Sequence, residues 1–314
     1  MTELNERYIW EWIYGTALTG CIDFEKKTMK LSLNKEQVLL FAGPGGRFSQ
    51  YGAFQVSNSA LVPYKKLKTA FKKNGGGLSF ETYPDKLWNG LDHTGCTRYR
   101  NFLMHDWLPK LKFTKQKLEN GGRFADFGCG VGRSTIELAK EFPKAKFYGF
   151  DAYEKNIETA KKYGLEAGVS HNTEFKHWTV SEGSPGKFDI VAAFDLIHDL
   201  PDPEEGLRVI KASMKSNSIF LLMDIESADD PIDNSGPLTL FKLGMSLHFC
   251  MTTAMSQGGE GMGTVGLSSK VLTDLCYKVG FKKLKKVEIA HPLNCHYEIL
   301  YRKVLAIKTN AYLK

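Results

Sequence analysis

A glycine-rich turn at residues 126–132 constrains the fold of this 314-residue chain more than any other segment. The turn reads Asp-Phe-Gly-Cys-Gly-Val-Gly and lies between an apolar strand-like run and a helix-like run. Glycine lets the backbone approach a ligand closely, because no Cβ lies in the way. Nineteen residues after Gly132, the strand-like segment 146–150 leads into Asp151, which can accept hydrogen bonds from both hydroxyls of a ribose. The spacing therefore predicts a nucleoside-binding α/β fold.

The order of the glycines indicates which nucleoside this turn accepts. Dinucleotide-binding turns have the spacing G-x-G-x-x-G, whereas this turn reads G-x-G-x-G and continues with Arg133. A pyrophosphate needs several free backbone N–H groups at the start of a helix, but S-adenosylmethionine carries no phosphate. Asp126, ahead of the glycines, suits a ligand with an ammonium and a sulfonium group. We therefore predict S-adenosylmethionine as the cofactor, with a structural turn in another Rossmann-like protein as the alternative.

Strand-like and helix-like segments alternate through the second part of the chain. The predicted strands cover residues 123–127, 146–150, 173–180, 188–194, 218–223, 281–290 and 296–303. Such alternation is typical of a doubly wound, Rossmann-like parallel sheet, and the last two strands form a hairpin that supplies an antiparallel last strand. We therefore predict a seven-stranded α/β domain over residues 119–314. Ligands of such sheets bind at the carboxyl ends of the strands.

Residues 1–118 predict a smaller, mainly helical domain that includes a linker and an active-site loop. Residues 3–18 have a helical pattern with Asn5 as a candidate N-cap. Residues 21–24 and 29–33 alternate apolar and polar side chains around a polar turn, which predicts a β-hairpin. A helix followed by a hairpin is typical of the second half of a winged helix. We expect the earlier helices of such a domain to be absent from this chain.

The composition argues against a membrane protein and against specific nucleic-acid binding. No segment offers the run of about 20 apolar residues that a membrane span needs, and the first residues lack the basic segment of a signal peptide. The net charge of +7 is mild, and the lysine clusters at 65–73 and 282–286 contain no arginine. The six cysteines form no C-x-x-C pair, and no motif requires a metal. We expect a cytoplasmic protein.

Two further segments support a more specific resemblance. Residues 195–203 read Asp-Leu-Ile-His-Asp-Leu-Pro-Asp-Pro, and residues 257–263 read Gln-Gly-Gly-Glu-Gly-Met-Gly. With the glycine turn and Asp151, they resemble the two-domain class I S-adenosylmethionine-dependent methyltransferases, in which a winged-helix dimerisation domain precedes the catalytic domain. The resemblance covers nearly the whole chain. It implies methyl transfer to an oxygen or nitrogen atom of a small molecule by a homodimer.

The predicted cofactor site draws on the ends of the first four strands of the sheet. Asp151 is expected to hold the ribose, Tyr153 to stack on the adenine, and the residues after the third strand to line the same ring. Asp195 is expected to hold the ammonium group of the cofactor, with a turn-capping role as the alternative. The full predicted set is Asp126, Gly128, Cys129, Gly130, Gly132, Asp151, Ala152, Tyr153, Thr179, Val180, Ser181 and Asp195.

Two histidines are candidates for catalysis. His198 follows the fourth strand, where an acceptor would face the methyl group, and the ordinary pKa of histidine lies near neutrality. We predict that it acts as a general base, with a loop-capping role as the alternative. Residues 238–255 are rich in Leu, Phe and Met and lie where this fold carries its substrate lid. His248, within that segment, is the second candidate.

The sequence is also compatible with two other functions. A transcription regulator could sense S-adenosylmethionine through a degenerate enzyme domain, although the helix at 3–18 offers mainly acidic and aromatic side chains where base-reading residues would be needed. An aminopropyl transferase would keep the same cofactor and use an acidic pair such as Asp195 and Asp199. The sequence favours methyl transfer over both.

Overall fold

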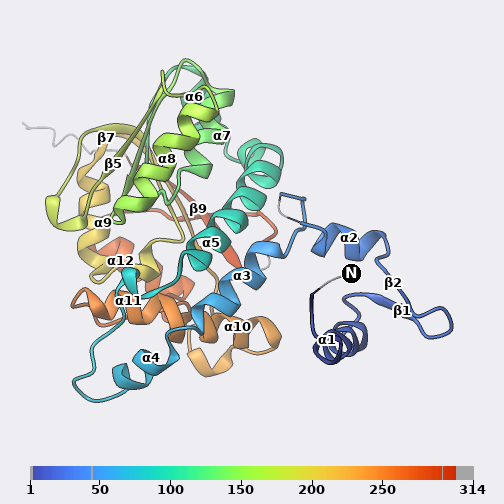
Figure 1. Cartoon of the computed structure of the whole chain (residues 1–314). Helices are drawn as coiled ribbons and strands as arrows, with labels where there is room; N and C mark the ends of the chain where they lie inside the picture. The colour runs from blue at the N-terminus through green and yellow to red at the C-terminus, as the bar shows by residue number, and fades with distance from the viewer. Residues whose placement is uncertain (1–2, 44, 292, 302–314) are drawn as a thin grey trace, which may run out of the picture.

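The computed structural model describes residues 3–43, 45–291 and 293–301, and its centre is a seven-stranded sheet with helices on both faces (Figure 1). The strand order is β5-β4-β3-β6-β7-β9-β8. The first five strands along the sheet are parallel, whereas β9 runs antiparallel to both of its neighbours. The predicted fold class is therefore confirmed. The strands are β3 Arg123–Phe127, β4 Lys146–Asp151, β5 Thr173–His177, β6 Phe188–Phe194, β7 Met214–Ile225, β8 Lys285–Val287 and β9 Asn294–Tyr301.

Two strands are shorter than the sequence pattern predicted. The strand predicted at 173–180 ends at His177, because the chain then turns into the 3-10 helix η4, Val180–Glu182. The strand predicted at 281–290 is reduced to the three residues of β8, because residues 281–284 have no regular structure. Residues 302 and 303, the end of the last predicted strand, lie outside the described residues.

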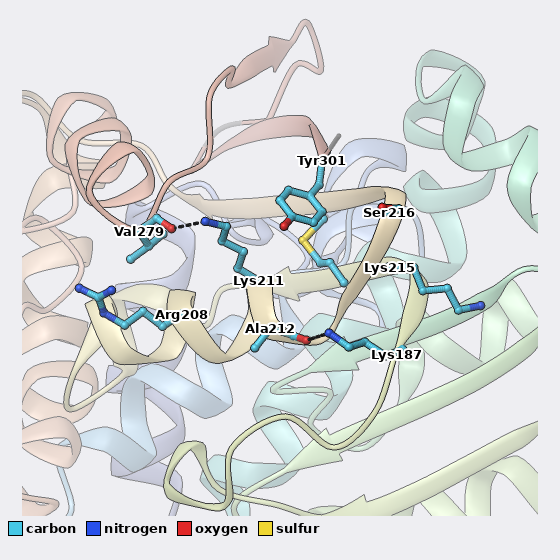
Figure 2. A pocket seen from close by; sticks show the side chains of 9 residues that line it. Lys187, Arg208, Lys211, Ala212, Lys215, Ser216, Val279 and Tyr301 are labelled. Atoms are coloured by element: carbon cyan, nitrogen blue, oxygen red, sulfur yellow. Dashed lines mark hydrogen bonds between the residues drawn. The ribbon is translucent and has the colours of Figure 1, made fainter. Parts of the chain in front are cut away.

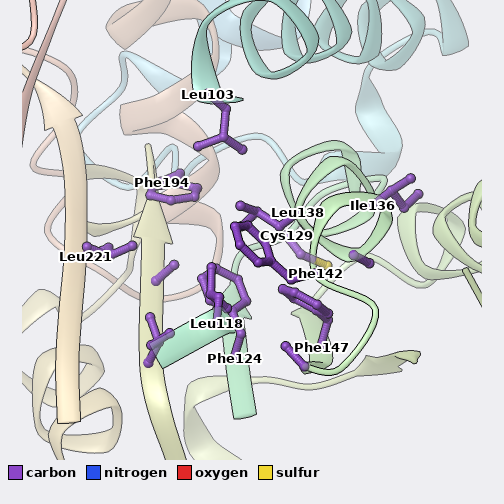
Figure 3. Packing of buried hydrophobic residues seen from close by; sticks show 14 of the residues in the cluster. Leu103, Leu118, Phe124, Cys129, Ile136, Leu138, Phe142, Phe147, Phe194 and Leu221 are labelled. Atoms are coloured by element: carbon purple, nitrogen blue, oxygen red, sulfur yellow. The ribbon is translucent and has the colours of Figure 1, made fainter. Parts of the chain in front are cut away.

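The helices on the two faces of the sheet bury separate apolar clusters. On one face, Leu118 and Ile136 belong to the cluster around Phe124 (Figure 3). On the other face, Leu207 and Leu272 belong to a second cluster of the same sheet. Both faces are therefore sealed from water, and only the strand ends remain for a ligand. These helices are α6 Lys112–Glu119, α7 Arg133–Glu141 and α8 Glu154–Glu166 on the first face, and α9 Pro203–Ala212 and α12 Ser269–Lys278 on the second.

The N-terminal residues form the predicted helix and hairpin. Asn5 caps the first helix, since its side chain accepts a hydrogen bond from the Arg7 backbone N–H at 3.0 Å. In Figure 1 this group lies to one side of the sheet domain, beyond α3. Residues 64–98 continue with α4 and α5, the latter packing against α3. The elements are α1 Glu6–Leu18, β1 Asp23–Glu25, β2 Lys30–Ser32, α2 Lys35–Phe41, α3 Tyr51–Ala60, α4 Tyr64–Ala70 and α5 Asp85–Arg98.

The helical region directly ahead of the sheet is not uniform. Helix α5 starts at Asp85, directly after Pro84, and passes without interruption into a π-helical segment, η2 Tyr99–Trp107. The short 3-10 helix η3, Leu108–Lys110, contains Pro109 and separates η2 from α6. π-Helical segments are rare and frequently occur at functional sites.

A helical segment between β7 and α12 covers the carboxyl edge of the sheet. It packs on the N-terminal part of the chain, where Leu78, Leu87 and Phe249 share one apolar cluster. Among the described helices, none combines the length and the apolar character needed to cross a bilayer. The segment consists of α10 Pro237–Met245, the π-helical η7 Ser246–Cys250 and α11 Met251–Ser256. The remaining short 3-10 helices are η1 Phe80–Thr82, η5 Ile197–Asp199 and η6 Pro231–Asp233.

Candidate active site

The glycine turn after β3 needs glycine for its backbone and for space. Gly128, Gly130 and Gly132 have φ angles of 71°, 55° and 77°, in the left-handed region that favours glycine. A Cβ on Gly132 would lie 2.7 Å from the ring of Phe175. A Cβ on Gly130, in contrast, would meet no described atom within 4 Å. The turn is therefore packed on one side and open at its middle glycine.

Asp151, the last residue of β4, is tied directly to this turn. One carboxylate oxygen accepts the Gly130 N–H at 2.8 Å. The other accepts the Tyr153 N–H and the Asn156 side-chain amide, each at 3.0 Å. Burial raises the pKa of Asp151 above its ordinary value, although these hydrogen bonds oppose the shift. The predicted ribose acid and the predicted glycine turn thus form one hydrogen-bonded unit.

Asp126 lies behind the turn instead of facing its opening. It is 1% exposed, and one carboxylate oxygen accepts hydrogen bonds from the hydroxyls of Ser134 and Thr135 in the first turn of α7. Burial raises its pKa to about 7. Its Oδ1 has no hydrogen-bond partner among the described residues. The side chain therefore anchors α7, and the ligand contact predicted for it rests on this one free oxygen.

We expect the substitution Asp126→Asn to remove a pH-dependent loss of stability. An unfolded aspartate has a pKa of about 3.9, whereas Asp126 in the folded protein has a pKa of about 7. Between pH values of about 3.9 and 7, the folded protein therefore binds more protons than the unfolded chain. The free energy of unfolding of the wild type should therefore fall as the pH rises through this window, by the order of 1–4 kcal/mol. Urea denaturation at pH 4.5, 6 and 8 measures this free energy of unfolding.

The amide in Asp126→Asn cannot ionise but can still accept from the two hydroxyls. The free energy of unfolding of this variant should therefore lack the fall with pH that the carboxyl of Asp126 causes in the wild type. Asp229→Asn, at an exposed position, is the matched control and should follow the wild type. Parallel pH profiles for wild type and Asp126→Asn would show that the buried carboxyl does not titrate in this range.

Asp195 has protein partners on both carboxylate oxygens. Arg98, at the end of α5, forms an ion pair with Oδ2, and the amide of Asn294 donates to Oδ1. Burial alone would raise the pKa of Asp195, but the charge of Arg98 outweighs it, so the pKa lies below its ordinary value. The residue has a positive φ of 53° directly after β6. The predicted ammonium-binding carboxylate is thus already neutralised by an arginine that the sequence analysis did not identify.

His198 is buried between two carboxylates. Its Nδ1 lies 2.5 Å from an oxygen of Asp224, and its Nε2 lies 3.2 Å from Asp199, while the side chain is 3% exposed. Burial lowers the pKa of His198, but the two carboxylates outweigh burial and raise the pKa well above the ordinary value. The two carboxylates therefore favour the protonated form of the ring. The alternative of a simple loop-capping histidine does not describe this arrangement.

Cys250, from the π-helical segment of the lid, completes the surroundings of His198. Donor atoms of His198, Asp199 and Cys250 lie within 4.8 Å of one another, the one such set in the described part of the chain. The three could share a metal ion, although burial raises the pKa of the Cys250 thiol to about 12, so a metal would have to displace its proton. No sequence signal indicated Cys250, whereas Asp224 stands at a predicted strand end.

The predicted adenine side of the site is partly occupied by protein. Thr179 and Ser181 share a hydrogen bond of 2.9 Å in the turn after β5, and the carbonyl of Ala152 lies 3.1 Å from a ring nitrogen of His177. The ring of Tyr153 is 8% exposed and packs on that of Trp88, with 4.5 Å between centroids. The stacking of Tyr153 on adenine stays a prediction, since Trp88 already occupies part of the surroundings of its ring. Trp88, which the sequence analysis did not select, covers the tyrosine instead.

His248 is engaged within the lid. Its Nδ1 lies 2.9 Å from the Gly244 carbonyl, and its own carbonyl accepts the hydroxyl of Tyr83 at 2.5 Å. The helical segment 237–256 also lies tightly against the loop that contains Gly77. A Cβ on Gly77 would lie 1.9 Å from the carbonyl oxygen of Thr252. The lid residue that the structure brings to His198 is therefore Cys250, not His248.

One cavity lies away from these residues. It measures about 570 Å³ and is lined by Lys187, Lys211, Lys215 and Tyr301 at the opposite end of the sheet (Figure 2). Lys187 and Lys211 donate to the carbonyls of Ala212 and Val279, which end α9 and α12. Cations at helix C-termini are stabilising. The two lysines of this cavity therefore cap helices, whereas the predicted site residues lie at the carboxyl edge of the sheet.

Comparison with known proteins agrees with this fold. Residues 118–246 match a family described as a methyltransferase domain. The ubiquinone biosynthesis O-methyltransferase of Bordetella avium (strain 197N) is 31% identical over 118 residues, which is 37% of this chain and 46% of that protein. A polyketide synthase, ThaQ, of Burkholderia thailandensis is 27% identical over 172 residues, 54% of this chain and 8% of that protein. The matches thus span less than half the length of these relatives.

Solved structures resemble the chain over nearly its whole length. A putative O-methyltransferase from Nostoc punctiforme PCC 73102 covers 95% of this chain and 86% of its own, with a TM-score of 0.69 and 15% identity. The mitomycin 7-O-methyltransferase MmcR covers 95% and 84%, with a TM-score of 0.64 and 16% identity. At these identities the likeness establishes the fold, including the helical region ahead of the sheet.

Proposed function

We propose that this chain, whose residues 118–246 match a family described as a methyltransferase domain, is an S-adenosylmethionine-dependent methyltransferase acting on an oxygen atom of a small molecule. The observation that carries the proposal is the position of His198. It follows β6, and its ring is held by Asp224 of β7 at 2.5 Å. The glycine turn follows β3, the other neighbour of β6. The glycine turn and the pair formed by His198 and Asp224 thus lie at the same edge of the sheet.

The residues of the turn fit the proposed cofactor. Gly130 leaves open space beside the backbone, and Asp151 holds a carboxylate at that same glycine. The buried, unpartnered Oδ1 of Asp126 suits a donor with positive charge. When bound, S-adenosylmethionine supplies a methyl group on a sulfonium, so the donor needs no further activation. The chain itself has to orient the acceptor and exclude water, and proximity alone contributes up to roughly 7–11 kcal/mol in favourable cases.

His198 supplies the base that a hydroxyl acceptor needs. Asp224 holds Nδ1, so Nε2, which lies 3.2 Å from Asp199 in this structure, is the nitrogen that would take the proton of the acceptor once it has given up its own. The positive charge that the ring then carries is stabilised by Asp224 and Asp199. Because a hydroxyl must lose a proton and a neutral amine need not, a buried base of this kind favours oxygen over nitrogen.

Direct tests of this proposal need no knowledge of the acceptor. Calorimetry should show binding of S-adenosylhomocysteine, and tighter binding of that compound than of NAD. Incubation with isotopically labelled S-adenosylmethionine and a cell extract, followed by mass spectrometry, should then reveal small molecules that gain a labelled methyl group. A chain that binds neither S-adenosylmethionine nor its product contradicts the proposal.

We further propose that the chain is a cytoplasmic homodimer joined through a winged-helix-like N-terminal region. Most of the exposed large apolar side chains of the described residues lie between residues 4 and 71. Tyr8, Trp12 and Leu18 of α1 are 78%, 56% and 87% exposed. A second copy of the chain would cover them, whereas acidic Glu6 and Glu11 on the same helix disfavour a phosphate backbone. All six cysteines are free thiols, which suits a reducing compartment.

Charging this apolar surface should dissociate the dimer. We expect wild type to sediment as a dimer at micromolar concentration and the double variant Trp12→Glu, Leu18→Glu to sediment as a monomer, because a buried unpaired carboxylate costs several kcal/mol. Ile232→Glu, at a position 85% exposed outside this region, is the control and should stay dimeric. A monomeric wild type would contradict the dimer. Sequence-specific retention of duplex DNA at about 150 mM salt would point to the regulator instead.

A further inference from the structure

Three side chains that can bind a metal meet at the carboxyl edge of the sheet. His198 and Asp199 lie in η5, and Cys250 is the last residue of η7 in the lid. Their donor atoms, a ring nitrogen, a carboxylate oxygen and a sulfur, all lie within 4.8 Å of one another. His198 and Cys250 are 3% and 6% exposed. Two segments far apart in the sequence thus bring three different metal-binding atoms to one buried place.

One of these atoms lacks a partner within the described part of the chain. Oδ1 of Asp199 lies 3.2 Å from Nε2 of His198, but the two atoms form no hydrogen bond. This oxygen is buried and has no other hydrogen-bond partner among the described residues. Buried polar atoms normally have partners. The carboxylate oxygen is therefore available to a ligand that also contacts His198.

The other nitrogen of the His198 ring is held as in many zinc sites. Nδ1 lies 2.5 Å from an oxygen of Asp224, a residue that is 0% exposed. The second oxygen of Asp224 accepts the Ile197 N–H at 3.0 Å, which fixes the carboxylate in turn. Histidines that bind a metal through one ring nitrogen almost always donate the other N–H to a carboxylate, a carbonyl or water. The ring is therefore oriented with Nε2 on the side of Asp199 and Cys250.

The ligand set suits zinc better than magnesium or calcium. Zinc takes imidazole nitrogen, thiolate sulfur and carboxylate oxygen, and sites with three protein ligands keep a fourth position for water or substrate. Magnesium and calcium prefer oxygen ligands. The carboxylates of Asp199 and Asp224, on either side of the ring, also favour a dication at this place. The side chain of Asp199 is 31% exposed, which gives the ion a path from solvent.

We propose that His198, Asp199 and Cys250 bind one zinc ion, and that zinc at this place blocks the base of the proposed methyltransferase. Zinc binds through the lone pair of Nε2, the same electron pair that takes the proton of the acceptor, so the two events exclude each other. In the metal-free chain, the ring is free to act as the base. The binding of zinc stands on the geometry alone, whereas the blocking role rests on the proposed function.

Zinc binding is tested on the untagged full-length chain without any acceptor. Calorimetry with zinc chloride should show one ion per chain, and magnesium chloride should show no binding. Asp224→Asn should weaken zinc binding about 10- to 100-fold, the usual cost of losing an outer partner of a metal ligand. Cys250→Ser removes a ligand itself and should cost about 100-fold or more. Cys21→Ser, which removes a partly exposed thiol of the N-terminal region, is the matched control and should bind zinc as the wild type does.

Cobalt(II) in place of zinc gives a readout that a merely structural role of Cys250 would not move. The cobalt-loaded wild type should show thiolate-to-metal charge-transfer absorption, which Cys250→Ser abolishes and Cys21→Ser retains. Circular dichroism checks the fold of each variant. Should Cys250→Ser not fold, Asp199→Asn changes the partly exposed ligand and should weaken zinc binding to a similar extent.

The blocking role is measured with the acceptor that the labelling experiment identifies. Saturating zinc should lower the rate of the wild type by about 10²- to 10⁴-fold, the loss expected when a general base is removed, and EDTA should restore the rate. Cys250→Ser, compared with its own zinc-free rate, should need a higher zinc concentration for the same inhibition.

The outcomes separate this inference from the proposed function. If the wild type does not bind zinc, or if Cys250→Ser and Asp199→Asn bind it as tightly as the wild type, the metal site is overturned and the methyltransferase proposal stays intact. Zinc that binds at these residues but leaves the rate unchanged, or raises it, overturns the blocking role. A chain that binds zinc but neither S-adenosylmethionine nor its product keeps the metal site and contradicts the proposed function.

Discussion

Replacing His198 with alanine is expected to lower kcat by about 10²- to 10⁴-fold and to leave cofactor affinity nearly unchanged. The ring is buried and held at Nδ1 by Asp224, so its removal takes away the base without disturbing the glycine turn or Asp151. Single-turnover kinetics with an identified acceptor measures the chemical step, and calorimetry measures the affinity. A loss smaller than about tenfold would mean that proximity carries the catalysis and that no base is needed.

A base at His198 also predicts how the rate depends on pH. The carboxylates of Asp199 and Asp224 raise the pKa of His198 well above its ordinary value, so the ring must lose a proton before it can act as a base. The rate of wild type should therefore rise with pH up to an apparent pKa above about 6.5. Asp224→Asn removes one of the two carboxylates and should move this limb to lower pH, with a reduced maximal rate.

His248→Ala is the matched control for the lid. Its ring contacts the carbonyl of Gly244 in its own helix, so we expect the pH limb to survive in this variant. A limb that persists in His198→Ala and disappears in His248→Ala would transfer the role of the base to the lid histidine.

Replacing Asp151 with alanine should weaken binding of S-adenosylhomocysteine by about 100-fold or more. Each charge-assisted hydrogen bond to a ribose hydroxyl contributes about 1.5–3 kcal/mol, and a factor of ten corresponds to about 1.4 kcal/mol. The loss is compounded because the same carboxylate holds the N–H of Gly130 at 2.8 Å. The variant thus removes a ligand contact and loosens the turn that lies beside it.

The control for Asp151→Ala is Asp202→Ala. Asp202 lies at the same edge of the sheet but caps α9, where it accepts the Glu205 N–H at 3.0 Å. Its removal should lower stability by about 1 kcal/mol without changing cofactor affinity. If calorimetry finds equal affinity in wild type and Asp151→Ala, the glycine turn and Asp151 do not bind the nucleoside.

The parts of the fold that the sequence predicted are those set by local patterns. The glycine turn, β3, β4 and the acidic end of β4 follow from residues within about 30 positions of each other, where strand and helix periodicity is strong. The N-cap at Asn5 and the hairpin after α1 are equally local. Boundaries were less accurate, as at β5, because the turn that ends the strand depends on side-chain capping by Thr179.

The residues that were not predicted depend on contacts between distant segments. Arg98 meets Asp195 across 97 positions, and no spacing in the sequence relates the two. Trp88 covers Tyr153 only because α5 crosses the edge of the sheet. Cys250 reaches His198 through the packing of the lid. The sequence therefore predicted residues that share one strand or one turn, whereas pairs that join distant segments emerged only from the tertiary structure.

The position of β9 has a consequence for synthesis on the ribosome. Among the described strands, β8 pairs only with β9, and β9 inserts between β8 and β7. Until residues 294–301 have emerged, β8 has no neighbour and β7 keeps an open edge, a surface prone to pairing with other chains. Asn294, which contacts Asp195, arrives with the same strand. Until β9 has emerged, a nascent chain therefore exposes an open edge of the sheet and lacks the contact of Asn294 with Asp195, and the pairing of β9 supplies both.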